Sequence, residues 1–398
     1  MQRYLSIADA LPRDGIEFVM PACDWRGFES APLPASSAVV LDFVSVLSRR
    51  LMAQGNLWPD LVALGFWLRP TAVRSHLAAY GSAMPLGLSF HLVPSNVPTL
   101  ALFSWLMALF MGNSSILRLS QRQDPVQQQL LAVCADLLAE PDWQAIASRV
   151  RFIRYAHDDQ LTARFSALCQ LRVIWGGDRT VQQIRAIALA PQARELVFPD
   201  RRSLALLSGE GLALLSEVEL AMTCSRLAQD ISQFNQQACA SPTTLVWLGE
   251  IPTALRERVY LALAEPFLAE PSWGMTRLVN CQLAVAQGAA SVCRMQKGLT
   301  LLRRTHEEGA LTVGGGVLLE LNVLADTAEQ ALALWLSRGE NIQTCVCVGI
   351  APARVHELGR QYPATRIDRV VAPGQALAFD WFWDGQDLLN AYSRCVRG

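Results

Sequence analysis

The stretch Leu171–Gly177, with the sequence LRVIWGG, is a mostly apolar run followed by two glycines. The apolar run predicts a short buried strand, and a helix is expected to begin just after the glycines, at Thr180 or Val181. Glycine allows the tight turn that such a junction needs. The stretch therefore predicts a strand–turn–helix unit, the building block of parallel sheets.

The same alternation extends in both directions from this unit. Strands are expected at residues 86–93, 115–119, 150–155, 171–175 and 204–207, and helices at residues 38–54, 98–111, 126–138, 158–168 and 181–188. Strands that alternate with helices of this length pair in parallel and form a doubly wound α/β sheet. In that architecture ligands bind at the carboxyl ends of the strands, beside the helix N-termini.

A second α/β region is expected from residue 209 onward. Its predicted helices are residues 217–230, 254–268 and 327–338, and its predicted strands are residues 243–248, 283–286, 317–321 and 343–349. The sequence thus predicts a first domain over residues 1–208 and a second domain over residues 209–372. A C-terminal segment, residues 373–398, is expected to fold back on the rest of the chain.

The composition describes a globular chain of 398 residues, because 52% of the residues are hydrophobic and 17% are charged. The formal net charge of −1 provides no basic surface for nucleic acid. Ten cysteines at irregular spacing and five histidines form no metal-binding pattern, so no metal site is predicted. The N-terminus shows no signal peptide, which favours a cytoplasmic protein with free thiols.

One uncharged stretch, Leu92–Leu117, is long enough on hydropathy to cross a bilayer. Prolines at 94 and 98 break its beginning, and Gly112 breaks its end. The unbroken helical part would span only about 20 Å at 1.5 Å per residue. The sequence therefore predicts a buried core helix rather than a membrane span.

Two segments contain side chains suited to acyl chemistry. Asn235–Cys239, with the sequence NQQAC, places a cysteine after a polar run, where it could act as a nucleophile held in a turn. Free cysteines are more often buried and inert, so the residues alone favour packing. Pro94–Pro98, with the sequence PSNVP, contains Asn96, whose amide could donate to an oxyanion. Its simpler interpretation is a helix N-cap.

Together and in this order, the two segments resemble those of the aldehyde dehydrogenase superfamily. The closer resemblance is to its acyl-CoA reductase branch, the family of the bacterial luminescence fatty-acid reductase subunit. It extends over roughly residues 55 to 398, and further similar pieces are Ala63–Arg69, Trp175–Gly177, Ile367–Arg369 and Trp383–Gly385. The resemblance implies an aldehyde dehydrogenase-like fold, with a doubly wound cofactor-binding domain and a second α/β domain that carries the nucleophile.

The resemblance also implies roles for individual residues. Cys239 would be the nucleophile, and the Asn96 amide with the Cys239 N–H would hold the oxyanion. The turn formed by Trp175, Gly176 and Gly177 would lie near the diphosphate of a nicotinamide cofactor.

Arg118 and Ser120, at the end of the strand predicted over residues 115–119, would lie near the adenosine ribose. An arginine there could pair with a 2′-phosphate, which favours NADPH over NADH, although a surface arginine at a strand end is an equal alternative.

One departure from the superfamily concerns its water-activating glutamate, which lies in a Glu-Leu-Gly-Gly segment. Residues 198–201 (FPDR) take its place here, and Glu195 lies out of register. The resemblance thus implies a reductase. Cys239 would attack an acyl-CoA or acyl-carrier thioester, the carrier thiol would leave, and hydride from NADPH would give an aldehyde through a thiohemiacetal.

Several alternatives stay open. The protein could have an acyl-activating synthetase as a partner, and it could form a homo-oligomer. Its cofactor could be NADH. Its function could instead be that of an aldehyde dehydrogenase working in the oxidative direction, or of a non-catalytic scaffold subunit.

Overall fold

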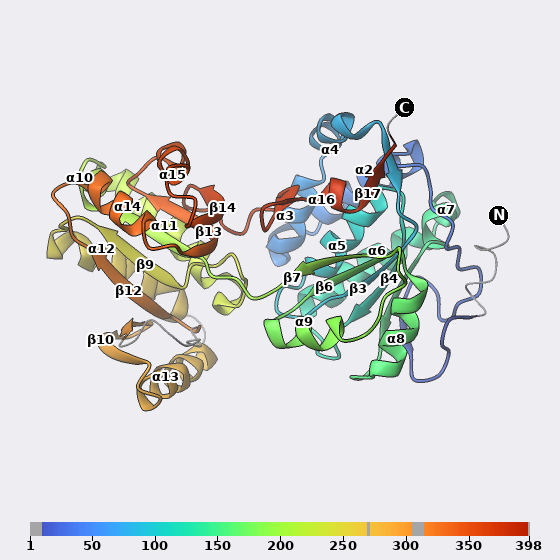
Figure 1. Ribbon diagram of the computed structural model, residues 1–398, viewed down its shortest axis with the longest axis horizontal. Helices are drawn as coiled ribbons and strands as arrows, with labels where there is room; N and C mark the ends of the chain where they lie inside the picture. Colours follow the sequence, from blue (N-terminus) through green and yellow to red (C-terminus); the bar gives the residue numbers. More distant parts are fainter. Residues whose placement is uncertain (1–9, 269–270, 305–313, 397–398) are drawn as a thin grey trace. The chain divides into compact units, whose positions relative to one another are not determined.

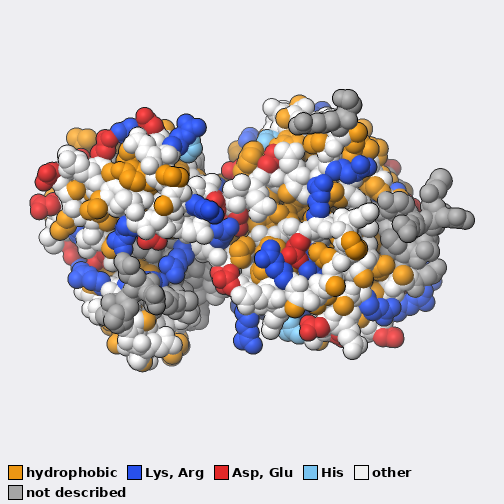
Figure 2. Space-filling model, viewed as in Figure 1, with side chains coloured by type: hydrophobic (Ala, Val, Ile, Leu, Met, Phe, Trp, Pro, Cys, Tyr) orange, Lys and Arg blue, Asp and Glu red, His pale blue; other side chains and the backbone are white. Residues whose placement is uncertain are grey.

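A computed structural model describes residues 10–268, 271–304 and 314–396. The chain forms two compact units (Figure 1). The first unit combines Met1–Asp200 with Gln386–Gly398, and the second unit is Arg201–Gly385. Figure 2 shows acidic and basic side chains interspersed over the visible face, in keeping with the net charge of −1.

The first unit is built around a sheet with the strand order β1-β5-β4-β3-β6-β7. Its strands are β1 (Glu17–Met20), β3 (Leu88–Leu92), β4 (Ser114–Leu119), β5 (Val150–Arg154), β6 (Leu171–Trp175) and β7 (Arg194–Phe198). All neighbours pair in parallel except β1 with β5. Residues of β3, β4, β5 and β6 are almost all buried, because helices cover both faces of the sheet.

The helices of the first unit lie on two sides of this sheet. Figure 1 shows α5 and α6 on one face and α8 and α9 on the other. The main helices are α2 (Ala38–Met52), α3 (Pro59–Trp67), α4 (Pro70–Leu77), α5 (Leu100–Phe110), α6 (Pro125–Leu138), α8 (Asp159–Leu168) and α9 (Asp178–Arg185). Residues 101–110 of α5 are all buried, which confirms that the uncharged stretch forms a core helix. Among the described residues, none of the helices combines the length and apolarity that a bilayer crossing requires.

The end of the chain completes the first unit. Strand β17 (Ser393–Cys395) pairs antiparallel with β2 (Ala83–Pro85). Asn113 links the residue before β17 to the residue after β2. Its amide donates to the Tyr392 carbonyl at 2.8 Å and accepts from the Leu86 N–H at 2.8 Å. The segment expected at residues 373–398 is therefore divided, with residues up to 385 in the second unit and the remainder in the first.

A buried polar network around His91 lies beside Tyr392, the residue just before β17. His91 Nδ1 is 2.8 Å from Ser104 Oγ, and its Nε2 is 2.8 Å from Ser89 Oγ. The Tyr392 ring stacks on His91 with centroids 5.9 Å apart. Burial lowers the pKa of His91 to about 3, so the ring is neutral in the folded protein.

The first unit should therefore lose stability in mild acid. The ordinary pKa of histidine is 6.5 and the folded value is lower, so the unfolded chain binds the proton preferentially as the pH falls below 6.5. The free energy of unfolding should decrease by up to about 1.4 kcal/mol per pH unit through this group, down to the folded pKa. Thermal unfolding of wild type and His91→Gln at several pH values checks this. The variant should show the shallower profile, and exposed His157→Gln should match wild type. Parallel wild-type and His91→Gln profiles would contradict the expectation.

The second unit contains a sheet with the strand order β10-β11-β12-β9-β8-β13-β14. Its strands are β8 (Leu204–Ser208), β9 (Thr244–Leu248), β10 (Ala290–Gln296), β11 (Leu299–Arg304), β12 (Val317–Val323), β13 (Asn341–Val348) and β14 (Arg366–Val371). Its main helices are α11 (Glu217–Ser232), α12 (Thr253–Ala264), α13 (Pro271–Ala286), α14 (Ala328–Leu336) and α15 (Pro352–Gly359). Only the β10–β11 pair is antiparallel among these described strands.

Two predictions of the sequence are wrong here. Strand β8, expected to end the first domain, lies between β9 and β13 in the second sheet. The strand at the edge of the first sheet is β7 instead, so the first unit ends at Asp200 rather than residue 208. Residues 283–286, expected as a strand, form the end of α13. A four-residue apolar run cannot distinguish a strand from one turn of helix.

Candidate functional site

Cys239 lies just after a strained turn in the second unit. Phe234, Asn235 and Gln236 have φ values of +54°, +52° and +63°, in the left-handed region that side chains other than glycine rarely adopt. Such strain persists only where the surroundings hold it, and it is common at functional sites. Cys239 as a residue is half-buried, whereas the residues around it in the same segment, Gln236, Ala238 and Ala240, are buried.

Gln236 holds the strained turn in place. Its buried amide donates to the Val317 carbonyl at 3.0 Å and to the Pro242 carbonyl at 3.3 Å, and it accepts from the Gly316 N–H at 3.3 Å. Gly316 has a φ of +91°, and a Cβ there would lie 2.4 Å from the Gly298 carbonyl oxygen. The loop that carries the cysteine is thus fixed to the beginning of β12.

The Cys239 sulfur is surrounded by hydrogen-bond donors and one nearby carboxylate. Gln343 Nε2 lies 3.3 Å from Sγ, and the backbone N–H groups of Cys239 and Ala240 also favour the thiolate form and lower the pKa of the thiol. Burial raises the pKa of the Cys239 thiol to about 11. The three donors act against this shift, whereas the charge of Asp384 adds to it.

A cluster of charged side chains adjoins Gln343. Its Nε2 also donates to Asp384 Oδ1 at 2.5 Å. The Arg201 guanidinium lies between two carboxylates, with Nε 3.8 Å from Asp384 and Nη1 4.0 Å from Asp368. The Arg369 guanidinium covers the Trp383 ring at 5.0 Å. The segments Ile367–Arg369 and Trp383–Gly385, which carry part of the family resemblance, therefore meet beside the cysteine.

Asn96 lies in the loop between β3 and α5 of the first unit and is half-buried. Helix α5 begins at Leu100, and its N-cap residue is Thr99. The interpretation of Asn96 as the N-cap is therefore wrong. Its oxyanion role stays a prediction.

The expected cofactor residues at the end of β4 make contacts within the first unit. Arg118 Nη2 donates to the Tyr155 carbonyl at 3.1 Å, and its guanidinium lies 5.3 Å from the centre of the Tyr155 ring. Burial lowers the pKa of Arg118. The Ser120 hydroxyl accepts from the Arg122 N–H at 3.2 Å. The hydrogen bond to Tyr155 uses one of the five N–H donors of Arg118, so pairing with a 2′-phosphate stays a prediction.

Trp175 places its side chain in the interior. The ring is 6% exposed, stacks on Phe198 at 3.6 Å, and donates from Nε1 to Ser104 Oγ at 3.0 Å. Only the backbone of Trp175 is therefore available at the strand-to-helix turn.

Gly176 and Gly177 form the turn before α9, as the sequence predicts, but the Asp200 carboxylate already binds a backbone N–H there. Asp200 Oδ2 accepts the Asp178 N–H at 3.1 Å, and it lies 2.8 Å from where a Cβ on Gly177 would be. A diphosphate would compete with this carboxylate for the same N–H and would be repelled by its charge. The Asp178 N–H would be open to a diphosphate only if Asp200, which is exposed, gave up this hydrogen bond.

Removal of this charge should strengthen cofactor binding. Two unit charges about 4 Å apart repel by about 1 kcal/mol in water, so Asp200→Asn should lower the Kd for a nicotinamide cofactor, NADPH or NADH, about fivefold. Fluorescence titration at fixed ionic strength measures this. Asp159→Asn, which removes an exposed first-turn carboxylate from α8, is the matched control and should change little. Unchanged or weaker binding in Asp200→Asn would show that the diphosphate does not bind at this turn.

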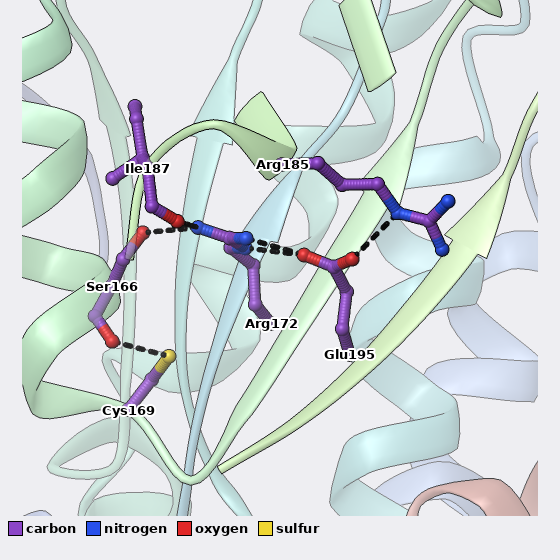
Figure 3. Close-up of polar contacts among 6 residues, drawn as sticks. All are labelled: Ser166, Cys169, Arg172, Arg185, Ile187 and Glu195. Atoms are coloured by element: carbon purple, nitrogen blue, oxygen red, sulfur yellow. Dashed lines mark hydrogen bonds and ion pairs between the residues drawn. The ribbon is translucent and has the colours of Figure 1, made fainter. Parts of the chain in front are cut away.

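The Glu195 carboxylate forms ion pairs with two arginines of the first unit (Figure 3). It accepts from Arg172 Nε at 2.8 Å and from Arg185 Nε at 2.8 Å. Arg172 also donates to Ser166 Oγ and to the Ile187 carbonyl, so each of its three nitrogens has a partner. Glu195 therefore has a structural role that explains its presence near the expected position of a catalytic base.

Comparisons with known proteins agree with this architecture. The acyl-CoA reductase (LuxC) family model matches residues 65–267, just over half of the chain. The long-chain acyl-protein thioester reductase of Aliivibrio fischeri is 26% identical over 182 residues, which are 45% of this chain and 36% of that protein. The same-named protein of Photorhabdus laumondii is 26% identical over 190 residues, covering 46% of this chain and 37% of its own. The aligned part thus spans about a third of these relatives' length.

Solved aldehyde dehydrogenases share the fold. The indole-3-acetaldehyde dehydrogenase of P. syringae has a TM-score of 0.61 at 15% identity, over 90% of this chain and 82% of its own. The gamma-glutamyl-gamma-aminobutyraldehyde dehydrogenase of Burkholderia cenocepacia has a TM-score of 0.62 at 13% identity, with the same coverage of both chains. The predicted aldehyde dehydrogenase-like α/β fold is confirmed. With its family-model match, the chain belongs to the acyl-CoA reductase (LuxC) family.

Proposed function

We propose that this protein reduces an acyl thioester to an aldehyde through a thioacyl group on Cys239. The observation that carries the proposal is the setting of Cys239, a half-buried residue just after a strained turn, whose sulfur accepts a hydrogen bond from Gln343 Nε2. Membership of the acyl-CoA reductase family supports it. The relatives named as long-chain acyl-protein thioester reductases favour a fatty acyl group on coenzyme A or on a carrier protein.

In the first step the Cys239 thiolate forms a bond to the carbonyl carbon of the thioester. The bond between that carbon and the donor sulfur breaks, and the donor leaves as a thiolate with the electron pair. The Cys239 N–H and the Asn96 amide are the proposed donors to the oxyanion, a contribution typically worth about 3 kcal/mol for one donor. A nicotinamide cofactor, NADPH if Arg118 pairs with a 2′-phosphate, would supply a hydride to the carbonyl carbon of the thioacyl group. The bond between that carbon and Cys239 Sγ then breaks, and the sulfur leaves as a thiolate with the electron pair as the aldehyde forms.

The proposed direction is supported by the lack of a glutamate in the segment where the superfamily has its water-activating base. A thioacyl group survives long enough to be reduced only if no neighbouring carboxylate activates water. Glu195 is paired with two arginines, and residues 198–201 (FPDR) take the place that the resemblance gives to the superfamily's Glu-Leu-Gly-Gly segment. These features support reduction.

The proposal is tested by mixing the protein with acyl-CoAs of increasing chain length, without reductant, and mapping adducts by mass spectrometry. An acyl adduct on the peptide that contains Cys239 is expected, with the chain length ranked by adduct yield. Adducts spread over exposed Cys23 and Cys395, with none on Cys239, would refute the proposal.

A second candidate is aldehyde oxidation, which one observation favours. The Asp384 carboxylate shares an amide donor with the Cys239 sulfur, and its Oδ2 is buried without a hydrogen-bond partner in the described part of the chain. A carboxylate beside the sulfur could activate water. The lifetime of the acyl adduct separates the two functions. Rapid hydrolysis that Asp384→Asn slows would favour oxidation, and a long-lived adduct favours reduction.

A further inference from the structure

The side-chain amide of Gln343 contacts two groups at once. Its Nε2 is 3.3 Å from Cys239 Sγ and 2.5 Å from Asp384 Oδ1. An ionised carboxylate only accepts hydrogen bonds, so it must face the NH2 end of the amide and not the oxygen. Because the same nitrogen lies beside the sulfur, Asp384 decides which end of the Gln343 amide the sulfur meets.

The position of Asp384 is fixed by a costly local structure. Its φ of +49° lies in the left-handed region, and its side chain is 1% exposed. The next residue, Gly385, has a φ of +69°, in the left-handed region, and a Cβ there would displace the Asp368 carboxylate, whose Oδ1 would lie 2.9 Å away. Arg201 offsets the buried negative charge from 3.8 Å. Strain and burial of this kind are maintained where a side chain must be held in one place.

We propose that Gln343 is the hydrogen-bond donor that favours the reactive thiolate of Cys239, and that Asp384 is a positioning residue that turns this amide toward the sulfur. The inference rests on the proposed function, because it assumes that Cys239 acts as a nucleophile. Gln343 would prepare the sulfur for attack, and the Trp383–Gly385 segment of the family resemblance would supply the residue that orients Gln343.

Asp384 therefore acts on the sulfur in two opposite ways. Its negative charge disfavours the thiolate directly, and the amide that it orients favours the thiolate through a hydrogen bond. Removal of the charge alone would make Cys239 more reactive, whereas loss of the orientation would make it less reactive. The sign of the change in reactivity thus separates a positioning role from a purely electrostatic one.

The test measures the rate at which iodoacetamide alkylates Cys239 as a function of pH, read by mass spectrometry of its peptide. Neither substrate nor cofactor is present. Gln343→Ala should move the midpoint of the profile upward by about one pH unit, which is about a tenfold lower rate on the acid side of the midpoint. Gln361→Ala, an exposed glutamine of the same unit, is the matched control and should leave the profile unchanged.

A double-mutant comparison tests the positioning role. Asp384→Asn should slow alkylation severalfold in the wild-type background, because an asparagine can present either end to Gln343. In the Gln343→Ala background the same change should speed alkylation, since only the loss of charge remains. Faster alkylation by Asp384→Asn in both backgrounds would overturn the proposal.

Gln343→Met is a second variant, which tests the donor role even if Gln343→Ala does not fold. Methionine has a similar length and no amide, so it should fill the same space and reproduce the shift of Gln343→Ala. An unchanged pH profile in folded Gln343→Met, verified by its thermal unfolding, would overturn the donor role. The readout is independent of the proposed function. If Cys239 is acylated but its alkylation rate does not depend on Gln343, only this inference is refuted. If the alkylation rate depends on Gln343 but Cys239 is not acylated, only the proposed function is refuted.

Discussion

Cys239→Ala should form no acyl adduct at this position and should lower acyl-thioester-dependent oxidation of NADPH below detection. The reaction as proposed passes through a bond to this sulfur, and alanine has no atom that can replace it. The substitution removes one weak hydrogen bond to Gln343 and leaves the Gln236 contacts of the loop intact. Thermal stability should therefore change little, so a loss of activity cannot be attributed to unfolding.

Cys23→Ala is the control for this experiment. Cys23 is exposed and lies in the first unit, so its removal should preserve both the adduct and the reduction. NADPH oxidation by Cys239→Ala at a measurable fraction of the wild-type rate, with acyl-CoA present, would exclude the thioacyl mechanism.

Asn96→Ala should lower kcat about 10²–10³-fold, the usual effect of removing one donor to an oxyanion. The loss should appear already in the rate of Cys239 acylation without cofactor, because the oxyanion first forms in that step. KM should change much less, since the donor acts mainly in the transition state. Stopped-flow acylation and steady-state reduction measure the two quantities.

Ser95→Ala tests whether such a loss is specific to the Asn96 amide. Ser95 is the neighbouring half-buried residue of the same loop, and its replacement should be nearly silent. Equal losses in both variants would indicate that the loop as a whole is sensitive. A normal acylation rate in Asn96→Ala would remove this side chain from the oxyanion site.

The sequence predicted the central strands well because parallel strands are continuous apolar runs. Strands β3, β4, β5 and β6 are buried along nearly their whole length and stand out between helices. Strand β7 was missed because Arg194 and Glu195 interrupt its apolar character, and both charges have partners in the folded unit. Strand β8 was placed in the wrong sheet, because a fully apolar strand does not encode its neighbours.

The candidate site was only partly predictable for a similar reason. Cys239 and Asn96 lie in short segments with a recognisable order of residues. Gln343 lies 104 residues away from the cysteine in a strand, and nothing in its local sequence marks it as a neighbour of the sulfur. All residues of β6 are buried, so the sequence could not indicate that the Trp175 ring turns toward Phe198 and Ser104 instead of a cofactor.

The division of the first unit between the two ends of the chain affects how the protein matures. A ribosome will have completed residues 201–385 before it adds β17, whose partner β2 was made some three hundred residues earlier. Until then the backbone of β2 and the Asn113 amide lack the contacts that Ser393–Cys395 and Tyr392 supply. The first unit thus cannot be completed until a strand made after the whole of the second unit has been added.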